Sequence, residues 1–174
     1  MYYFTADEHF GHENIIEYCK RPFSSVEEMD EVMIQNHNSI VTKQDITVHI
    51  GDFSLASKKY QDIQNKYIIR LNGHHIFIPG SHDYWLKGKN KQSHIWQKSI
   101  NKQQVICCHY PMYAWPASHW NSWHLFGHVH GQFEGVGKSL DVGVDVFNFK
   151  PVSFDEIVKI MESRPDNLDR IKPT

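Results

Sequence analysis

Short apolar runs alternate with stretches of helical periodicity along this chain. The runs predict strands at residues 2–6, 46–50, 75–78, 105–108, 123–126 and 140–144. Between several of them, apolar residues recur every three to four positions, which predicts helices at residues 13–19, at 58–70 and from 25 onward. Alternation of the two kinds of element favours an α/β sheet protein.

Serine and glutamate three residues apart mark the starts of two predicted helices. Ser25 with Glu28, and Ser153 with Glu156, have the capping-box spacing, in which each side chain bonds the main-chain amide of the other residue. Beyond the second of these helices, residues 164–174 are polar and include two prolines. We therefore expect a polar, extended C-terminal tail.

Length, charge and cysteine content restrict the class of protein. At 174 residues the chain is expected to form a single domain, residues 1–174. A net charge of −2 gives no general attraction to anionic membranes and does not indicate stable nucleic-acid binding. The chain has three cysteines, an odd number, which does not indicate a disulfide framework. No apolar stretch approaches the ~20 residues that span a bilayer. We expect a cytoplasmic protein that needs no membrane.

Residue types that can bind cations follow five of the apolar runs. The motifs are Asp7-Glu8-His9, Gly51-Asp52, Gly80-Ser81-His82-Asp83, His109 and Gly127-His128-Val129-His130. In open α/β sheets, sites form at the carboxyl ends of strands, so these motifs can meet in space although they are distant in sequence. The chain also has 13 histidines, and histidine is the commonest metal ligand among side chains.

The combination of carboxylate and imidazole suits Mn²⁺, Fe or Zn²⁺. Residues two apart in extended backbone share a face, so Asp7 with His9, and His128 with His130, can each reach one cation. An aspartate between two cations ~3.5–4 Å apart is the arrangement used in phosphoester hydrolysis. Each motif alone is as compatible with an ordinary surface turn, but together they predict a two-metal hydrolase.

In this order the five motifs resemble those of the calcineurin-like metallophosphoesterases. The signature of that superfamily is Asp-x-His, Gly-Asp, Gly-Asn-His followed by Asp or Glu, a lone His, and Gly-His-x-His. The match spans residues 7–130, and the text at residues 9–16 and 140–145 resembles a compact bacterial and phage branch. The resemblance implies an α/β fold with a four-layer α/β/β/α sandwich and a metal centre at the sheet ends.

The resemblance also implies a role for each motif residue. Two divalent metal ions are expected, Mn²⁺ first and Fe or Zn²⁺ as alternatives, with the ligands Asp7, His9, Asp52, Ser81, His109, His128 and His130. Asp52 would be shared between the ions. His82 would act on the phosphoryl group or its leaving oxygen, supported by Asp83, while a metal-bound hydroxide attacks phosphorus.

One position departs from the superfamily pattern. Ser81 stands where the signature has Asn, and a hydroxyl is a shorter and poorer donor to a hard cation than an amide carbonyl. We expect the second metal to be bound more weakly. The expected substrate is a small phosphodiester or nucleotide-like phosphoester, and the alternatives are a phosphomonoesterase or a metal-poor, non-catalytic interaction scaffold of the same fold.

Several other residues allow two interpretations. Tyr113, Trp115, Trp120 and Trp123 could form a rim that stacks a planar group, or a loop that packs its own aromatics. Arg21 could contact a phosphate group, but a salt bridge at the surface is favoured. His12 could line the site beside His9, or could cap or orient a ligand. Asp141 and Asp145 could orient a metal-binding imidazole, or could bond the main chain of turns.

Overall fold

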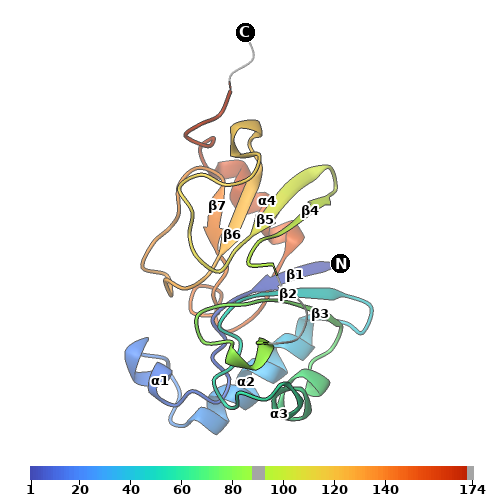
Figure 1. Cartoon of the computed structure of the whole chain (residues 1–174), viewed down its shortest axis with the longest axis vertical. Helices are drawn as coiled ribbons and strands as arrows, with labels where there is room; N and C mark the ends of the chain where they lie inside the picture. Colours follow the sequence, from blue (N-terminus) through green and yellow to red (C-terminus); the bar gives the residue numbers. More distant parts are fainter. Residues whose placement is uncertain (88–92, 172–174) are drawn as a thin grey trace.

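Two four-stranded sheets form the centre of the molecule, and the chain folds as a mixed α/β protein (Figure 1). The computed structural model describes residues 1–87 and 93–171. The strand order is β3-β2-β1-β8 in the first sheet and β4-β5-β6-β7 in the second. The strands are β1 (Tyr2–Thr5), β2 (Ile46–Ile50), β3 (His74–Ile78), β4 (Trp96–Ile100), β5 (Gln103–Cys107), β6 (Trp123–Phe126), β7 (Ser139–Asp141) and β8 (Val152–Ser153).

Parallel strands dominate both sheets. β1 pairs with β2 and β2 with β3, all parallel, while β5, β6 and β7 form a parallel set in the second sheet. The carboxyl ends of parallel strands lie at one edge of a sheet, so the segments that follow β1, β2 and β3 emerge together. The six strands predicted from the apolar runs are all present, with ends that differ by a few residues.

The two strands that the pattern did not predict are antiparallel edge strands. β4 pairs with β5 through a hairpin whose two connecting residues, Asn101 and Lys102, both have positive φ (48° and 69°). Tight hairpins require such left-handed residues, but the usual signal is Asn-Gly, which is absent here. β4 is largely exposed, and β8 has only two residues, so neither carries a clear apolar pattern.

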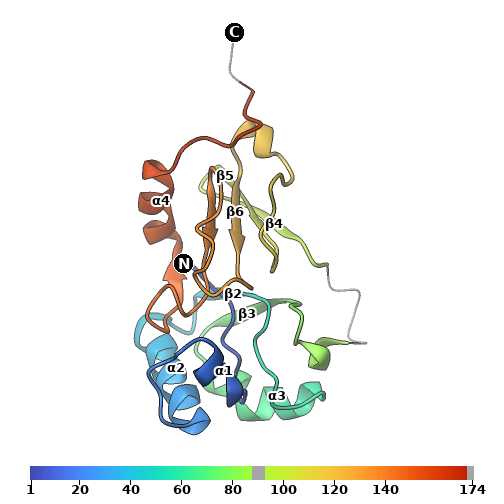
Figure 2. The same ribbon diagram turned by 90° about the vertical axis from the view of Figure 1, so that its left-hand side faces the viewer.

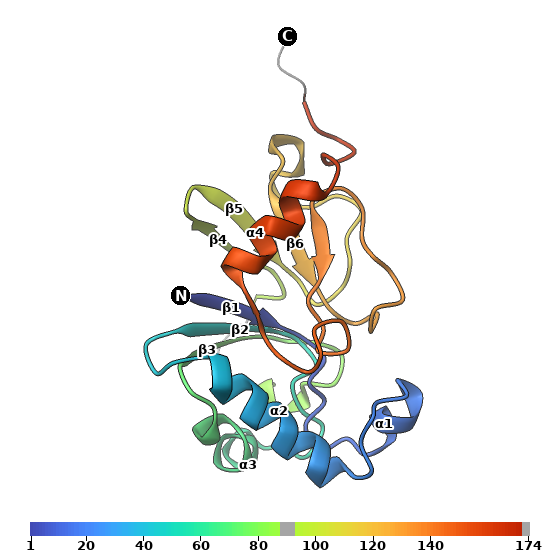
Figure 3. The same cartoon turned by 180° about the vertical axis from the view of Figure 1, so that it is seen from behind.

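Four α-helices accompany the sheets: α1 (Asn14–Tyr18), α2 (Val26–Ile40), α3 (Tyr60–Lys66) and α4 (Phe154–Ser163). Figures 2 and 3 place α1, α2 and α3 beside the first sheet, and α4 alongside the second. The capping box is complete at Ser153 and Glu156. At α2 only half of it forms, because Ser25 accepts from the Glu28 amide while the Glu28 carboxylate bonds Ser24 instead.

The core is divided into two apolar clusters. One joins both sheets to α4, through residues such as Phe4, Val48, Leu125 and Ile157. The other lies between the first sheet and its helices and includes Phe10, Met29, Ile63, Tyr67 and Trp85. The first sheet is thus covered on both faces, which holds the ends of its strands firmly.

The C-terminal segment is more ordered than expected over its described part. Asn167 is buried, donates to the carbonyl oxygens of Ser118 and Ser122, and accepts from the Lys138 amide. The predicted tail is therefore attached to the second sheet's loops at this point, while residues 172–174 lie outside the described residues. None of the described helices has the length and hydropathy needed to cross a membrane.

Candidate metal centre

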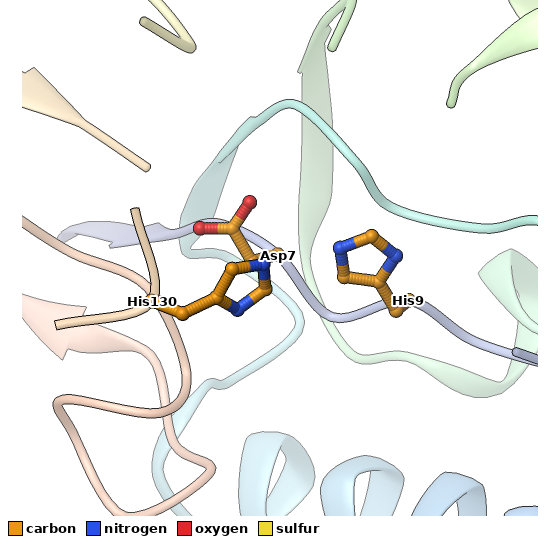
Figure 4. A group of neighbouring side chains, drawn as sticks. All are labelled: Asp7, His9 and His130. Atoms are coloured by element: carbon orange, nitrogen blue, oxygen red, sulfur yellow. The ribbon is translucent and has the colours of Figure 1, made fainter. Parts of the chain in front are cut away.

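The motif residues converge at the carboxyl ends of the strands into two groups of potential ligands. Asp7, His9 and His130 form one group, and Asp52, His109 and His128 form the other, each with ligand atoms within 4.8 Å of one another. Asp7 and His9 come from the segment after β1, and His130 comes from a separate loop beyond β6 (Figure 4). We call these the His9 group and the His109 group.

The main chain is bent sharply at the candidate ligands. Five of them have positive φ, between 48° and 73°: Asp7, His9, Asp52, His128 and His130. Such backbone is costly for residues other than glycine and gathers at functional sites. Glycine allows close approach beside them, since a Cβ at Gly80 would collide with the Asp52 carboxylate, and one at Gly127 with the Asp7 carboxylate.

Asp52 belongs to the His109 group and also faces the His9 group. Its Oδ2 is 3.3 Å from His109 Nε2 and 3.8 Å from His9 Nε2. Burial alone would raise the pKa of Asp52, but the His109 imidazole and the main-chain amide of His82 lower it below the usual range. The carboxylate is therefore ionised and faces one histidine from each group.

The two buried histidines that face Asp52 each have a nitrogen without a hydrogen-bond partner. These atoms are Nε2 of His9 and Nε2 of His109. His109 Nδ1 lies 2.9 Å from the Ile50 carbonyl oxygen, which places a proton on Nδ1, so a cation at Nε2 would replace the second proton of the ring. Buried polar atoms are seldom left unpaired, and two imidazole nitrogens that face one carboxylate fit a cation in the place of a proton. The residues present thus fit divalent metal ions.

The charges at the site perturb both acids and bases. Burial raises the pKa of Asp7 to about 7, against the opposing effect of His109 and His130. Burial lowers the pKa of His109, but the neighbouring Asp52 and Asp7 more than offset this and raise it to about 9. The site without metal holds protons that a bound cation would displace, because metal ligands must be deprotonated.

The residues of the third motif have different surroundings. The Asp83 carboxylate accepts hydrogen bonds from the amides of Asp52, Phe53 and Gly80 and from the Trp85 indole, at 2.7–3.0 Å. It therefore supports the loop that carries Asp52. The side chain of His82 is 40% exposed, with Nε2 4.0 Å from Asp52 Oδ2, so it stands at the open side of the site.

Ser81 contacts the shared carboxylate. Its hydroxyl donates to Asp52 Oδ2 at 3.0 Å, with Oδ1 at 3.4 Å. The side chain thus reaches the His109 group, at the position where the superfamily signature has an amide. In this geometry the hydroxyl orients the Asp52 carboxylate.

The two aspartates that allowed two interpretations have different roles. Asp145 Oδ2 lies 2.7 Å from His130 Nδ1, so this carboxylate orients an imidazole. Asp141 accepts from the amides of Gly131 and Gly143 and so holds turns. Arg21, for which the sequence favoured an exposed salt bridge, is buried beneath the site and pairs with Asp145.

Aromatic and imidazole rings adjoin the candidate ligands. His12 lies against His9 and His82, with ring centroids at 5.3 Å and 5.9 Å. Tyr110, which the sequence did not single out, packs against His128 with centroids at 4.8 Å. Of the aromatic segment, Trp115 is buried against His124, whereas Tyr113 and Trp120 are exposed. The segment therefore packs partly on itself, as one of the two interpretations held.

Comparison with known proteins identifies a relative that spans nearly the whole chain. The uncharacterized protein MJ1445 of Methanocaldococcus jannaschii is 36% identical over 167 residues, which cover 92% of this chain and 90% of the relative. The chain belongs to the MJ1445 family. No protein-family model matches it.

Solved structures agree with the fold. A protein of unknown function from Aquifex aeolicus, AQ665, has a TM-score of 0.72 at 25% identity, covering 92% of this chain and 98% of that protein. A predicted phosphoesterase from Streptococcus pneumoniae has a TM-score of 0.46 at 13% identity, covering 82% of this chain and 70% of that protein. The second likeness is too distant to carry an argument. The MJ1445 family thus shares its fold with AQ665.

Proposed function

We propose that this member of the MJ1445 family is a metal-dependent phosphoesterase with a dinuclear centre. The observation that carries the proposal is the pair of unpartnered Nε2 atoms, one on His9 and one on His109, that face the same ionised Asp52 carboxylate. One aspartate between two half-sites is the arrangement expected of a two-metal hydrolase. In this proposal the two sheets and their helices are a compact version of the α/β/β/α sandwich.

Two sets of side chains would hold the cations. The His9 group and Asp52 would hold the first, and the His109 group would hold the second with Ser81 alongside. Mn²⁺ is favoured, with Fe or Zn²⁺ as alternatives, because the donors are carboxylates and imidazoles and include no thiolate. When bound, the two cations would lower the pKa of water and neutralise charge on a phosphoryl group.

The residues of the chain divide the remaining work. The Asp52 carboxylate, which faces both His9 and His109, would supply negative charge to both cations. His82 stands at the open side with an exposed ring, where it can hydrogen bond to a phosphoryl oxygen or protonate the leaving oxygen. Asp83 contributes indirectly, because its hydrogen bonds to the amides of Asp52 and Gly80 keep the Asp52 and His82 loops together.

The proposed substrate is a small phosphodiester or nucleotide-like phosphoester. The exposed ring of Tyr110 and the partly exposed ring of His12 adjoin the candidate ligands and offer surfaces on which a base or another planar group can stack, worth ~1–3 kcal/mol per base. A phosphomonoesterase is the second candidate, since the site is open and its two half-sites suit either ester.

The proposal is tested by metal content and hydrolysis together. Metal-free protein would be loaded with Mn²⁺, crystallised and measured at the manganese absorption edge. Anomalous peaks are expected among the His9 and His109 groups. The same sample would be assayed with bis(p-nitrophenyl) phosphate and p-nitrophenyl phosphate. Absence of peaks at these side chains contradicts the metal centre, and bound metal with neither ester hydrolysed supports the scaffold alternative instead.

A further inference from the structure

A buried arginine lies beneath the His9 group. The side chain of Arg21 is 0% exposed, although arginine is almost never fully buried unless it is paired. Its Nε and Nη2 donate to the two oxygens of Asp145, each at 2.8 Å. Nη2 also donates to the Asp7 carbonyl oxygen at 2.7 Å, and Nη1 to the Glu8 carbonyl oxygen at 3.0 Å. These bonds connect the Asp7–His9 turn to Asp145.

The same carboxylate holds His130. Asp145 Oδ2 lies 2.7 Å from His130 Nδ1, while both of its oxygens accept from Arg21. The bond to Nδ1 leaves Nε2 as the nitrogen available to a cation. A carboxylate behind a histidine ligand sets its tautomer and ring orientation. One arginine and one aspartate thus connect the two strand ends from which the His9 group is built.

A direct metal-binding role for Asp145 is disfavoured. Cys19, His130 and Asp145 also have potential ligand atoms within 4.8 Å of one another. However, the guanidinium of Arg21 occupies both Asp145 oxygens, and its positive charge would repel a cation placed there. Asp145 therefore acts from behind His130.

The His109 group has less support at its third ligand. The residue His128 is exposed, and the described residues provide no hydrogen bond to its ring, which contacts the rings of Tyr110 and His109. We propose that Arg21 and Asp145 are positioning residues that preform the metal site of the His9 group and leave the His109 group unaffected. The proposal rests on the proposed function only for the existence of the two sites, because its readout is metal binding and not hydrolysis.

The experiment measures Mn²⁺ binding by calorimetry in two single-site backgrounds. His128→Ala would remove a ligand of the His109 group, and His9→Ala would remove one of the His9 group. In the His128→Ala background, Asp145→Asn and Arg21→Lys are each expected to weaken Mn²⁺ binding 10–100-fold, the usual scale for residues behind a ligand. In the His9→Ala background, the same changes should alter the affinity by less than about threefold, because the ligands of the His109 group are not bonded to either residue.

Two controls separate positioning from general damage to the fold. Arg70→Gln breaks an exposed arginine–carboxylate pair with Glu31 (2.6 Å), and should leave both affinities unchanged. Asp145→Glu keeps the charge and should bind more tightly at the His9 group than Asp145→Asn. Equal weakening in both backgrounds, or none in either, overturns the positioning role. A wild-type protein that binds no Mn²⁺ overturns this inference together with the proposed function, whereas binding without hydrolysis contradicts the proposed function alone.

Discussion

Histidines gather at two places in this molecule, and only one of them has the properties of a metal centre. In the candidate centre, His9 and His109 each have an unpartnered nitrogen beside the Asp52 carboxylate. Elsewhere, inside the core cluster below the first sheet, His49 and His75 are joined by a bond of 3.0 Å between ring nitrogens. The residue type is the same, but among the described residues the buried histidine nitrogens without a hydrogen-bond partner belong to the centre.

The histidines of the core, His37, His49 and His75, have hydrogen-bond partners within the protein. His49 Nδ1 lies 2.6 Å from Glu8 Oε1, His75 Nε2 is 3.4 Å from the Leu71 carbonyl oxygen, and His37 Nε2 is 2.9 Å from the Asn72 carbonyl oxygen. Burial lowers the pKa of His37, His49 and His75 to about 3. These residues are neutral parts of the core. A high histidine count is therefore informative only when the hydrogen-bond partners of each ring are known.

The largest effect is expected at Asp52, the carboxylate that faces His9 and His109 in the candidate centre. Asp52→Asn removes the negative charge shared by His9 and His109, so it should abolish both Mn²⁺ retention and hydrolysis of a model diester. Metal analysis after gel filtration and the diester assay would measure this. Retention of two Mn²⁺ ions by the variant would show that Asp52 is not shared.

His82 lies at the centre but is not one of the proposed metal ligands. His82→Ala should therefore keep the metal and lose rate, by ~10²–10⁴-fold for a proton-transfer role. Initial rates at saturating metal would measure the loss. His74→Ala, at an exposed position on β3, is the matched control. Full activity of His82→Ala on every ester that the wild type hydrolyses would exclude the proposed role.

Ser81 is expected to make the two sites differ in their affinity for Mn²⁺. Ser81→Asn supplies the amide that the superfamily signature has there, and should strengthen the second Mn²⁺ about 10–100-fold while leaving the first unchanged. Calorimetric titration of metal-free protein should show two unequal affinities in the wild type and closer ones in the variant. Two equal sites in the wild type, unaffected by the substitution, would show that the serine replaces the amide without loss.

Substitutions among the core histidines should change the stability of the protein and leave metal binding unchanged. His49→Leu removes the partner of Glu8 Oε1, and is expected to lower the free energy of unfolding by about 2 kcal/mol, the cost of a buried polar group without its partner. Urea unfolding of the metal-free protein would measure it, with exposed His74→Leu as the control. Weakened Mn²⁺ binding without a change in stability would assign His49 to the centre instead.

The last difference between the two places is in pH dependence. The pKa of His37 is lowered to about 3, so the unfolded state binds the extra proton, and this stability is complete above pH ~6.5 and lost as the pH falls toward 3. His37→Phe should reduce the slope of unfolding free energy against pH in this window by about 1.4 kcal/mol per unit. His109 in the metal-free centre has the opposite sign, since its pKa is raised to about 9 and its contribution is lost as the pH rises through 9. An unchanged acid slope in His37→Phe would contradict the comparison.

Much of this molecule follows from the sequence. Apolar runs predict strands without reference to the fold, because each run must be buried between two layers. The motif residues follow those runs by one to three positions, so parallel pairing alone brings Asp7, Asp52 and Ser81 to one edge. The capping box at Ser153 is equally local, since both partners lie within one helical turn.

Only the tertiary structure decided which polar groups were satisfied. The bond from His130 to Asp145 and the burial of Arg21 depend on loops that approach one another after folding, up to 124 residues apart in sequence. Glu8, between two candidate ligands, turns away from them to His49, which no local pattern indicates. The sequence determined which atoms can bind a cation. The fold determined which of them are left without a hydrogen-bond partner, because hydrogen bonding depends on distances that only packing sets.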